Sequence, residues 1–117
     1  MMNLPTVEQC RTAYRKQKLL PMCGEFLSAT HACPAAVFAI SRGVLRNPAA
    51  IEQWWLKQLG EQREDFSFLP FAWLISGIDG EQAAPDLLPA ELAAWSRGRE
   101  IRRAFSFDTV LCEQRIG

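Results

Sequence analysis

The stretch that decides the fold is 66–78, with the sequence FSFLPFAWLISGI. It holds three of the seven phenylalanines and one of the four tryptophans, and it contains no charged residue. Charged residues fence it on both sides: Arg63, Glu64 and Asp65 before it, Asp79 and Glu81 after it. In a small domain, such a segment is either the centre of the core or a surface that another protein covers.

We expect a helix within this stretch, over 68–76. Helical spacing puts four apolar side chains on one face and points Trp73 elsewhere; the four are Phe68, Phe71, Leu74 and Ile75. The alternation Phe66-Ser67-Phe68 also suits the start of a strand. The only candidate partner for such a strand is a second Phe-Ser-Phe, at 105–107.

Capping patterns predict the helices that precede the stretch. Thr6 followed by Gln9 has the form of a capping box and opens a helix over 7–20, which Pro21 ends or kinks. A nearly all-apolar helix should run from Pro34 to about 43. Asn47 and Pro48 then begin a helix over 48–59. Residues 22–33 are ambiguous, although 25–32 can form a short helix.

After the stretch, an acidic connection over 79–91 leads to a last helix over 89–105. Leu92 and Trp95 are the clear apolar pair of that helix, and Ile101 and Phe105 are one further pair. Gly98 weakens the middle of the helix and allows a bend. The alternation over 105–111 allows a short terminal strand. The sequence therefore predicts a mainly α, single-domain bundle of four or five helices spanning 1–117.

Charge and hydropathy limit the classes of partner that the chain can have. The 13 basic and 13 acidic residues cancel, so no bulk field draws the chain to nucleic acid or to an anionic membrane. No run approaches the roughly 20 apolar residues of a membrane span. Zero net charge offers little protection against self-association, which favours a homodimer or a standing protein partner.

The four cysteines, Cys10, Cys23, Cys33 and Cys112, form no Cys-x-x-Cys, and the N-terminus lacks the pattern of a secretory signal. We expect free, mostly buried thiols in a reducing cytoplasm. A zinc site can be imagined from Cys23, His31 and Cys33 with Cys112 or Cys10. Structural zinc sites usually bring two close pairs of ligands, however, and only one is present here. We therefore expect no metal and no cofactor.

Enzymatic and nucleic-acid-binding motifs are weak. A nucleophilic cysteine needs a nearby base, most often histidine, and the chain has only one histidine for four cysteines. The chain also has no nucleophile elbow, phosphate loop or dinucleotide fingerprint. We therefore expect that it is not an enzyme. The basic run Arg97–Arg103 makes a small DNA-binding regulator an alternative. Basic residues late in a helix also stabilise its dipole, which is the simpler interpretation.

Tryptophan is the residue most informative about function. Neighbours on a helix diverge by about 100°, so Trp54 and Trp55 cannot both point at one centre, and Trp73 diverges from the apolar face of its own helix. At least one of these large aromatics should therefore lie at a surface that binds protein. The predicted contact residues are Trp54, Trp55, Phe66, Phe68, Phe71, Trp73 and Leu74.

The whole chain resembles small bacterial quorum-sensing anti-activators of the QslA kind, which bind the regulator LasR. The resemblance lies in the length, the helical pattern, NPAAIEQWWLKQLG at 47–60 and the phenylalanine-rich run at 66–78. It implies a cytoplasmic, helical homodimer that binds a regulator's ligand-binding domain and so blocks dimerisation and DNA binding.

We therefore expect a non-enzymatic inhibitor that sequesters a transcription regulator by covering its dimerisation surface. A secretion chaperone or a toxin-immunity protein is the alternative among binding proteins.

Overall fold

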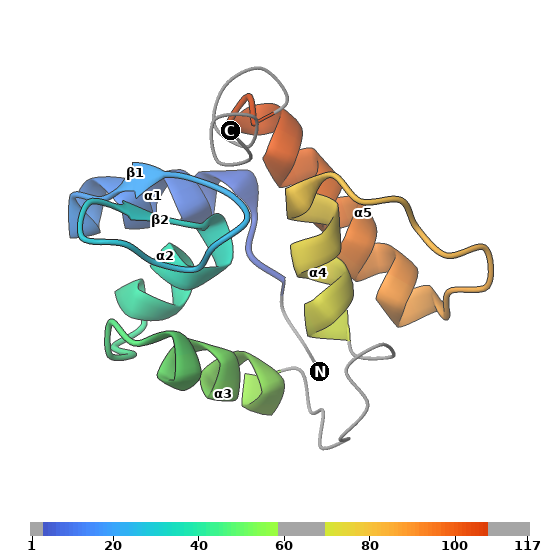
Figure 1. Cartoon of the computed structure of the whole chain (residues 1–117), viewed down its shortest axis with the longest axis horizontal. Coiled ribbons are helices and arrows are strands. Elements are labelled where there is room, and N and C mark those ends of the chain that lie inside the picture. Colours follow the sequence, from blue (N-terminus) through green and yellow to red (C-terminus); the bar gives the residue numbers. More distant parts are fainter. Residues whose placement is uncertain (1–3, 59–69, 108–117) are drawn as a thin grey trace.

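The computed structural model describes residues 4–58 and 70–107. The described part holds five helices and one two-stranded sheet, which confirms the mainly α prediction. The elements in chain order are α1 (Val7–Gln17), β1 (Leu20–Pro21), β2 (His31–Ala32), α2 (Pro34–Ser41), α3 (Pro48–Gln58), α4 (Pro70–Asp79) and α5 (Pro89–Ala104). In Figure 1, α1, α2 and α3 make one side of the molecule, and α4 and α5 lie side by side on the other.

The predicted caps of α1 and α3 are present. Thr6 Oγ1 accepts the Gln9 amide at 3.1 Å, and Gln9 Oε1 accepts the Thr6 amide at 2.9 Å, completing the capping box. Asn47 Oδ1 accepts the Ala50 amide at 3.1 Å at the start of α3. The end of α1 was predicted too late: Lys18 adopts a left-handed conformation (φ 56°), so the helix ends before Pro21.

No helix forms in 25–32. Instead β1 and β2 pair in parallel, with Leu20 opposite His31 and Pro21 opposite Ala32. Ser28 explains the difference, because its hydroxyl accepts the His31 amide at 3.1 Å and its amide donates to the His31 carbonyl at 2.8 Å. Such local side-chain bonds compete with helix formation.

The apolar stretch 66–78 contributes most of α4, which runs from Pro70 to Asp79; residues 66–69 lie outside the described residues. Its buried face is Phe71, Leu74 and Ile78, whereas Ile75 is only half-buried. The four-residue face predicted for this helix was thus right for two of its members and wrong for Ile75, while Phe68 is not described.

Helix α5 packs on α4 with a face of which the sequence predicted only Ile101. Glu91, Ala94, Gly98 and Ile101 are buried, whereas Leu92 is exposed and Trp95 is half-buried. The helix runs unbroken through Gly98, which faces Gly77 of α4, and the two backbones meet there. Small residues at a helix crossing permit this close approach.

The chain after α5 turns rather than extends. Phe105 caps the helix and Ser106 has a positive φ of 58°. Residues 105–107 are therefore not the start of a strand, and the strand partner considered at 66–68 lies outside the described residues.

Trp55 is the centre of the core. Its ring stacks on Phe71 of α4 at 5.9 Å between centroids and lies 5.8 Å from Phe38 of α2, so it joins three helices. Its indole Nε1 donates to the Ala35 carbonyl at 2.9 Å, which satisfies the one polar atom of a fully buried side chain.

Arg97 fastens the N-terminal segment to α5. Its guanidinium donates to the carbonyl oxygens of Pro5 at 2.8 Å and Leu4 at 3.4 Å, and Pro5 is buried. Tyr14 of α1 adds an edge-to-face contact with Phe105 at 5.3 Å. The two sides of the molecule are therefore joined near the start of the chain.

Candidate protein-binding surface

The seven predicted contact residues divide into three groups. Trp55, Phe71 and Leu74 are buried in the core, so a partner cannot reach them in this conformation. Trp54 and Trp73 are half-buried at the edge of the core. Phe66 and Phe68 lie outside the described residues.

Adjacent Trp54 and Trp55 point apart, as their helical spacing requires. Their rings meet edge to face, with centroids 5.1 Å apart and planes at 81°. Trp55 points into the core, whereas Trp54 lies in the wall of a surface hollow of about 390 Å³. This hollow extends from α3 to the N-terminal segment and is lined by Leu4, Thr6, Gln9, Phe38, Arg42, Trp54, Trp55 and Gln58.

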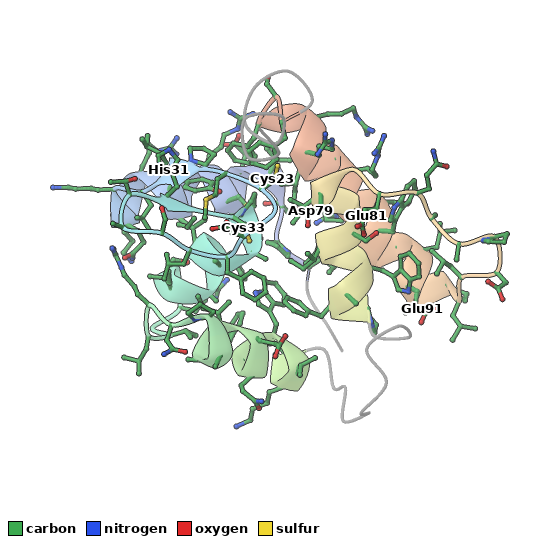
Figure 2. The ribbon with its side chains drawn as sticks, viewed as in Figure 1. Cys23, His31, Cys33, Asp79, Glu81 and Glu91 are labelled. Atoms are coloured by element: carbon green, nitrogen blue, oxygen red, sulfur yellow. The ribbon has the colours of Figure 1, made fainter. Side chains whose placement is uncertain are left out.

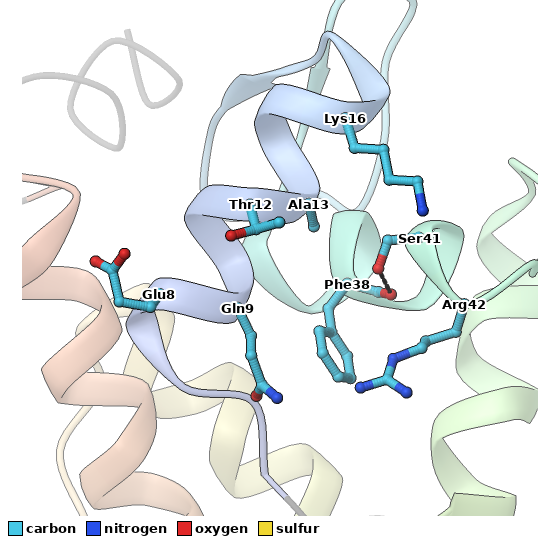
Figure 3. A pocket seen from close by; sticks show the side chains of 8 residues that line it. All are labelled: Glu8, Gln9, Thr12, Ala13, Lys16, Phe38, Ser41 and Arg42. Carbon is cyan, nitrogen blue, oxygen red and sulfur yellow. Dashed lines mark hydrogen bonds between the residues drawn. The ribbon is translucent and has the colours of Figure 1, made fainter.

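A second hollow, of about 440 Å³, adjoins the first between α1 and α2. Figure 3 shows its lining: Glu8, Gln9, Thr12, Ala13, Lys16, Phe38, Ser41 and Arg42. Gln9, Phe38 and Arg42 line both hollows, so the two form one continuous groove across three helices, which we call the α1–α3 groove. Its open form over three helices and its mixed polar and apolar lining suit a protein segment better than a compact small molecule.

Arg42 and Phe38 line both hollows of the groove. The Arg42 guanidinium lies 4.8 Å from the centre of the Phe38 ring, a cation–π distance. Ser41 Oγ donates to the Phe38 carbonyl at 2.6 Å and thereby takes up a free acceptor near the end of α2. Arg42 was not among the contact residues predicted from the sequence. Its position four residues after Phe38, on the same helical face, is the sequence feature that could have identified it.

The groove lies in the basic half of a neutral chain. Residues 1–58 hold seven basic and three acidic residues, whereas 59–117 hold six basic and ten acidic. Lys16 and Arg42 bring positive charge to the groove, against one acid, Glu8. An acidic partner surface therefore has a favourable electrostatic match here.

The candidate metal ligands do not assemble. Cys23 is disulfide-bonded, which corrects the expectation of free thiols and leaves no thiolate there for zinc. Cys33 Sγ accepts the Ala36 amide at 3.4 Å as the cap of α2, and His31 Nδ1 lies 2.7 Å from Thr30 Oγ1. In Figure 2, His31 lies on the α1–α2 side, away from Glu81 and Glu91, whereas Asp79 of α4 comes close to the cysteine region and lines one hollow with Cys33. Over 4–58 and 70–107, no group of three such side chains is placed to hold a metal ion.

The two free thiols are buried structural groups. Burial, followed by the neighbouring Cys33, raises the pKa of Cys10 to about 12. Burial likewise raises the pKa of Cys33 to about 12, although amide donation from Ala36 and Ala35 opposes the shift. Thiols of this kind are poor nucleophiles at neutral pH.

Most of the arginines in 97–103 have partners within the fold. Arg97 holds Leu4 and Pro5, and Arg97 Nε also pairs with Glu100 at 3.1 Å. Arg102 donates to the Ile78 carbonyl at 3.0 Å, and Arg99 lies 5.7 Å from the centre of the Trp95 ring. This use of the guanidinium groups weighs against the DNA-binding alternative, because phosphate contacts need their donors.

Comparison with known proteins gives no match: no family model, no curated protein and no solved structure is similar to this chain. Within the described ranges, none of the helices has the length and apolar character needed to cross a bilayer.

Proposed function

We propose that the chain is a non-enzymatic inhibitor that binds a transcription regulator, as a quorum-sensing anti-activator does. It covers the surface through which the regulator dimerises, and the regulator then fails to bind DNA. In this proposal the inhibitor acts in the cytoplasm as a homodimer. The observation that carries the proposal is Trp54, a large aromatic side chain left half-buried in the wall of the α1–α3 groove.

Trp54 has the environment of an interface anchor. Its ring contacts the Trp55 ring edge to face, and its centroid lies 6.1 Å from that of Phe38. The fold therefore fixes the position of Trp54 before a partner binds. Rigid aromatic side chains of this kind lose little conformational entropy on binding and dominate interface energies. Arg42 beside it supplies a residue type that interfaces also favour.

The contact set is accordingly narrower than the sequence predicted. Trp54 and Trp73 remain proposed contacts, and Arg42 joins them, whereas Phe38 is a buried core residue that supports Trp54 and Arg42. Trp55, Phe71 and Leu74 act through the core that supports this surface. The roles of Phe66 and Phe68 stay predictions.

The disulfide at Cys23 weighs against the cytoplasmic part of the proposal. Cytosolic reductants keep most protein thiols reduced, whereas disulfides persist in oxidising compartments. The proposal therefore requires that the chain still fold and bind its partner after reduction. Binding measured with and without a thiol reductant tests this requirement directly.

The main experiment is affinity capture from the source cytoplasm with the wild-type chain, a Trp54→Ala variant and a Leu45→Ala control. Leu45 is 75% exposed and is not among the groove residues, so its replacement controls for lost surface apolarity. We expect a regulator that is retained by wild type and by Leu45→Ala. Trp54→Ala should bind it about 30-fold more weakly, the loss typical of an interface hot spot.

The captured regulator is then purified, and its dimerisation and DNA binding are measured with increasing inhibitor. Loss of both supports the proposal. A regulator that still dimerises and binds DNA when saturated with the chain overturns the mechanism. Capture of a toxin or a secreted substrate instead would favour the immunity-protein or chaperone alternative.

A further inference from the structure

A third hollow, of about 250 Å³, lies between the C-terminal half of α4 and the connection that joins β1 to β2. We call it the α4 hollow. The side chains that line it are those of Glu25, Phe26, Cys33, Ile75, Ile78 and Asp79. It shares no residue with the α1–α3 groove, and the function proposed above makes no use of it.

The wall that the connection contributes is fixed by the fold. The Gly24 amide donates to Asp79 Oδ1 at 2.9 Å, which ties the connection to the end of α4. The Cys33 amide donates to the Phe26 carbonyl at 2.9 Å. Cys23, the residue before Gly24, is disulfide-bonded. The α4 hollow is therefore largely preformed, as small-molecule sites usually are.

One part of the lining is apolar. Ile78 and Cys33 are buried, and Phe26 and Ile75 are half-buried. Burial raises the pKa of the Cys33 thiol to about 12, so the thiol stays protonated and uncharged at neutral pH. These four side chains offer a surface against which a short hydrocarbon chain can be removed from water.

The other part of the lining is negative. Glu25 is exposed and Asp79 is half-buried, and none of the described residues that line the hollow is basic. Asp79 is also the last residue of α4, where the helix dipole adds partial negative charge, and no basic residue lies in that last turn. Arg102 of α5 donates to the Ile78 carbonyl at 3.0 Å near this end, but it is not among the lining residues.

This combination suits an organic cation better than a metal ion. Calcium binds about six to eight oxygen atoms and zinc about four ligands. Over the described ranges, no group of three metal-binding side chains comes together, and most of the lining of the α4 hollow is apolar. An alkylammonium ion, by contrast, needs acceptors only for its charged head, and it has an apolar body to bury.

We propose that the α4 hollow binds a small organic cation of the alkylammonium class. The hydrocarbon chain lies against Phe26, Ile75 and Ile78, and the ammonium group lies near the carboxylates of Glu25 and Asp79. The proposal does not depend on the function proposed above, because the two sites share no residue. Either can fail without the other.

The first test compares three probes that share one hydrocarbon chain and differ in charge: hexylammonium chloride, hexan-1-ol and sodium hexanoate. Amide chemical shifts of the isotope-labelled, oxidised protein follow each titration. We expect saturable shifts with hexylammonium at Gly24, Phe26 and Ile75, with a dissociation constant on the order of 1 mM. Hexan-1-ol should bind there about fivefold more weakly, and hexanoate more weakly still. Absence of saturable shifts with hexylammonium, or equally tight binding of hexan-1-ol or hexanoate, overturns the proposal.

The second test locates the charge that is recognised. Glu25→Gln removes one negative charge from an exposed side chain of nearly the same shape, and the spectrum of the unbound variant checks its fold. This variant should bind hexylammonium about threefold more weakly and hexan-1-ol as wild type does. Asp86→Asn is the matched control, because Asp86 is exposed and lies outside the lining. Equal losses of hexylammonium affinity in the two variants, or no loss in Glu25→Gln, rejects the site.

Discussion

Gly77 of α4 and Gly98 of α5 are in backbone contact. A Cβ built on Gly77 would overlap the Trp95 carbonyl oxygen and lie 3.0 Å from the Gly98 Cα; one built on Gly98 would overlap the Leu74 carbonyl oxygen and lie 2.9 Å from the Gly77 Cα. Every obstructing atom belongs to the backbone of the facing helix, so no side-chain rotation can relieve the overlap. The distance between α4 and α5 is therefore set by these two glycines.

Gly98→Ala should lower the free energy of unfolding by about 2 kcal/mol. Within a helix the same change usually stabilises by about 1 kcal/mol, because alanine is the better helix former. The sign is thus diagnostic of the close crossing. Ser96→Ala, at an exposed position of the same helix, is the control and should be neutral or slightly stabilising. Urea denaturation measures both; a stabilised Gly98→Ala protein would contradict the crossing.

Trp55→Phe should destabilise the fold by about 1 to 2 kcal/mol and leave partner binding largely intact. Phenylalanine keeps the ring stacked on Phe71 but loses the indole N–H, and so leaves the buried Ala35 carbonyl without its donor. Trp54→Phe should show the reverse pattern, with little effect on unfolding. Urea denaturation and partner binding, both measured on the two variants, distinguish the core role of Trp55 from the surface role of Trp54. Equal losses of stability in the two variants would argue against these separate roles.

Stability should fall as the pH rises above about 9. The folded pKa values of Cys10 and Cys33 are raised from 9.0 to about 12, so the native state keeps their protons while the unfolded chain releases them. The stabilisation that the protonated thiols give the native state is fully present below pH 9. It is lost as the pH approaches 12, and the free energy of unfolding then falls by roughly 1.4 kcal/mol per pH unit for each thiol. Burial shifts the pKa of Tyr14 upward as well, which adds to the same trend.

The measurement for the thiols is the pH dependence of urea unfolding in wild type and in Cys10→Ala. The Cys10→Ala variant lacks one thiol whose pKa is raised. Its free energy of unfolding should therefore fall less steeply at alkaline pH, by about the contribution of one thiol. An unchanged slope would show that Cys10 ionises equally in both states.

Reduction of the disulfide at Cys23 should lower the free energy of unfolding by about 2 to 4 kcal/mol without abolishing the fold. Most of the hydrophobic core, centred on Trp55, comes from helices, whereas Cys23 lies between β1 and β2. Thermal melts with and without dithiothreitol measure the loss for wild type. Cys23→Ser should melt near the reduced wild type and show no further response to the reductant. A reduced protein that is unfolded at physiological temperature would remove cytoplasmic action from the proposed function.

The sequence predicted the helices well where capping residues mark the N-terminus of the helix. Thr6 with Gln9, and Asn47 with Pro48, announce α1 and α3, and both sets of caps are present with good hydrogen bonds. The same holds for Trp54 and Trp55, whose divergence follows from helical geometry alone. These features need only neighbouring residues, which a sequence displays directly.

The buried face of α5 was missed except at Ile101, because its packing depends on shape more than on hydrophobicity. Leu92 and Trp95 are its most apolar pair, yet α4 packs against Ala94 and Gly98, where a small surface lets the backbones touch. A hydrophobicity pattern cannot show that Gly77, about twenty residues earlier, supplies the matching surface. The disulfide at Cys23 and the groove formed by α1, α2 and α3 likewise depend on segments that meet only after folding.

The hydrogen bonds from Arg97 to Leu4 and Pro5 bear on how this chain can be shortened or tagged. Terminal residues are usually dispensable, but here the carbonyls of the fourth and fifth residues occupy a guanidinium that would otherwise be left half-buried with unused donors. A shortened form beginning at Thr6 would keep every residue of α1 and its contact with Phe105, and would still lose both hydrogen bonds between the N-terminal segment and Arg97 of α5. Affinity tags are therefore better attached ahead of Met1 through a flexible spacer than exchanged for the first few residues.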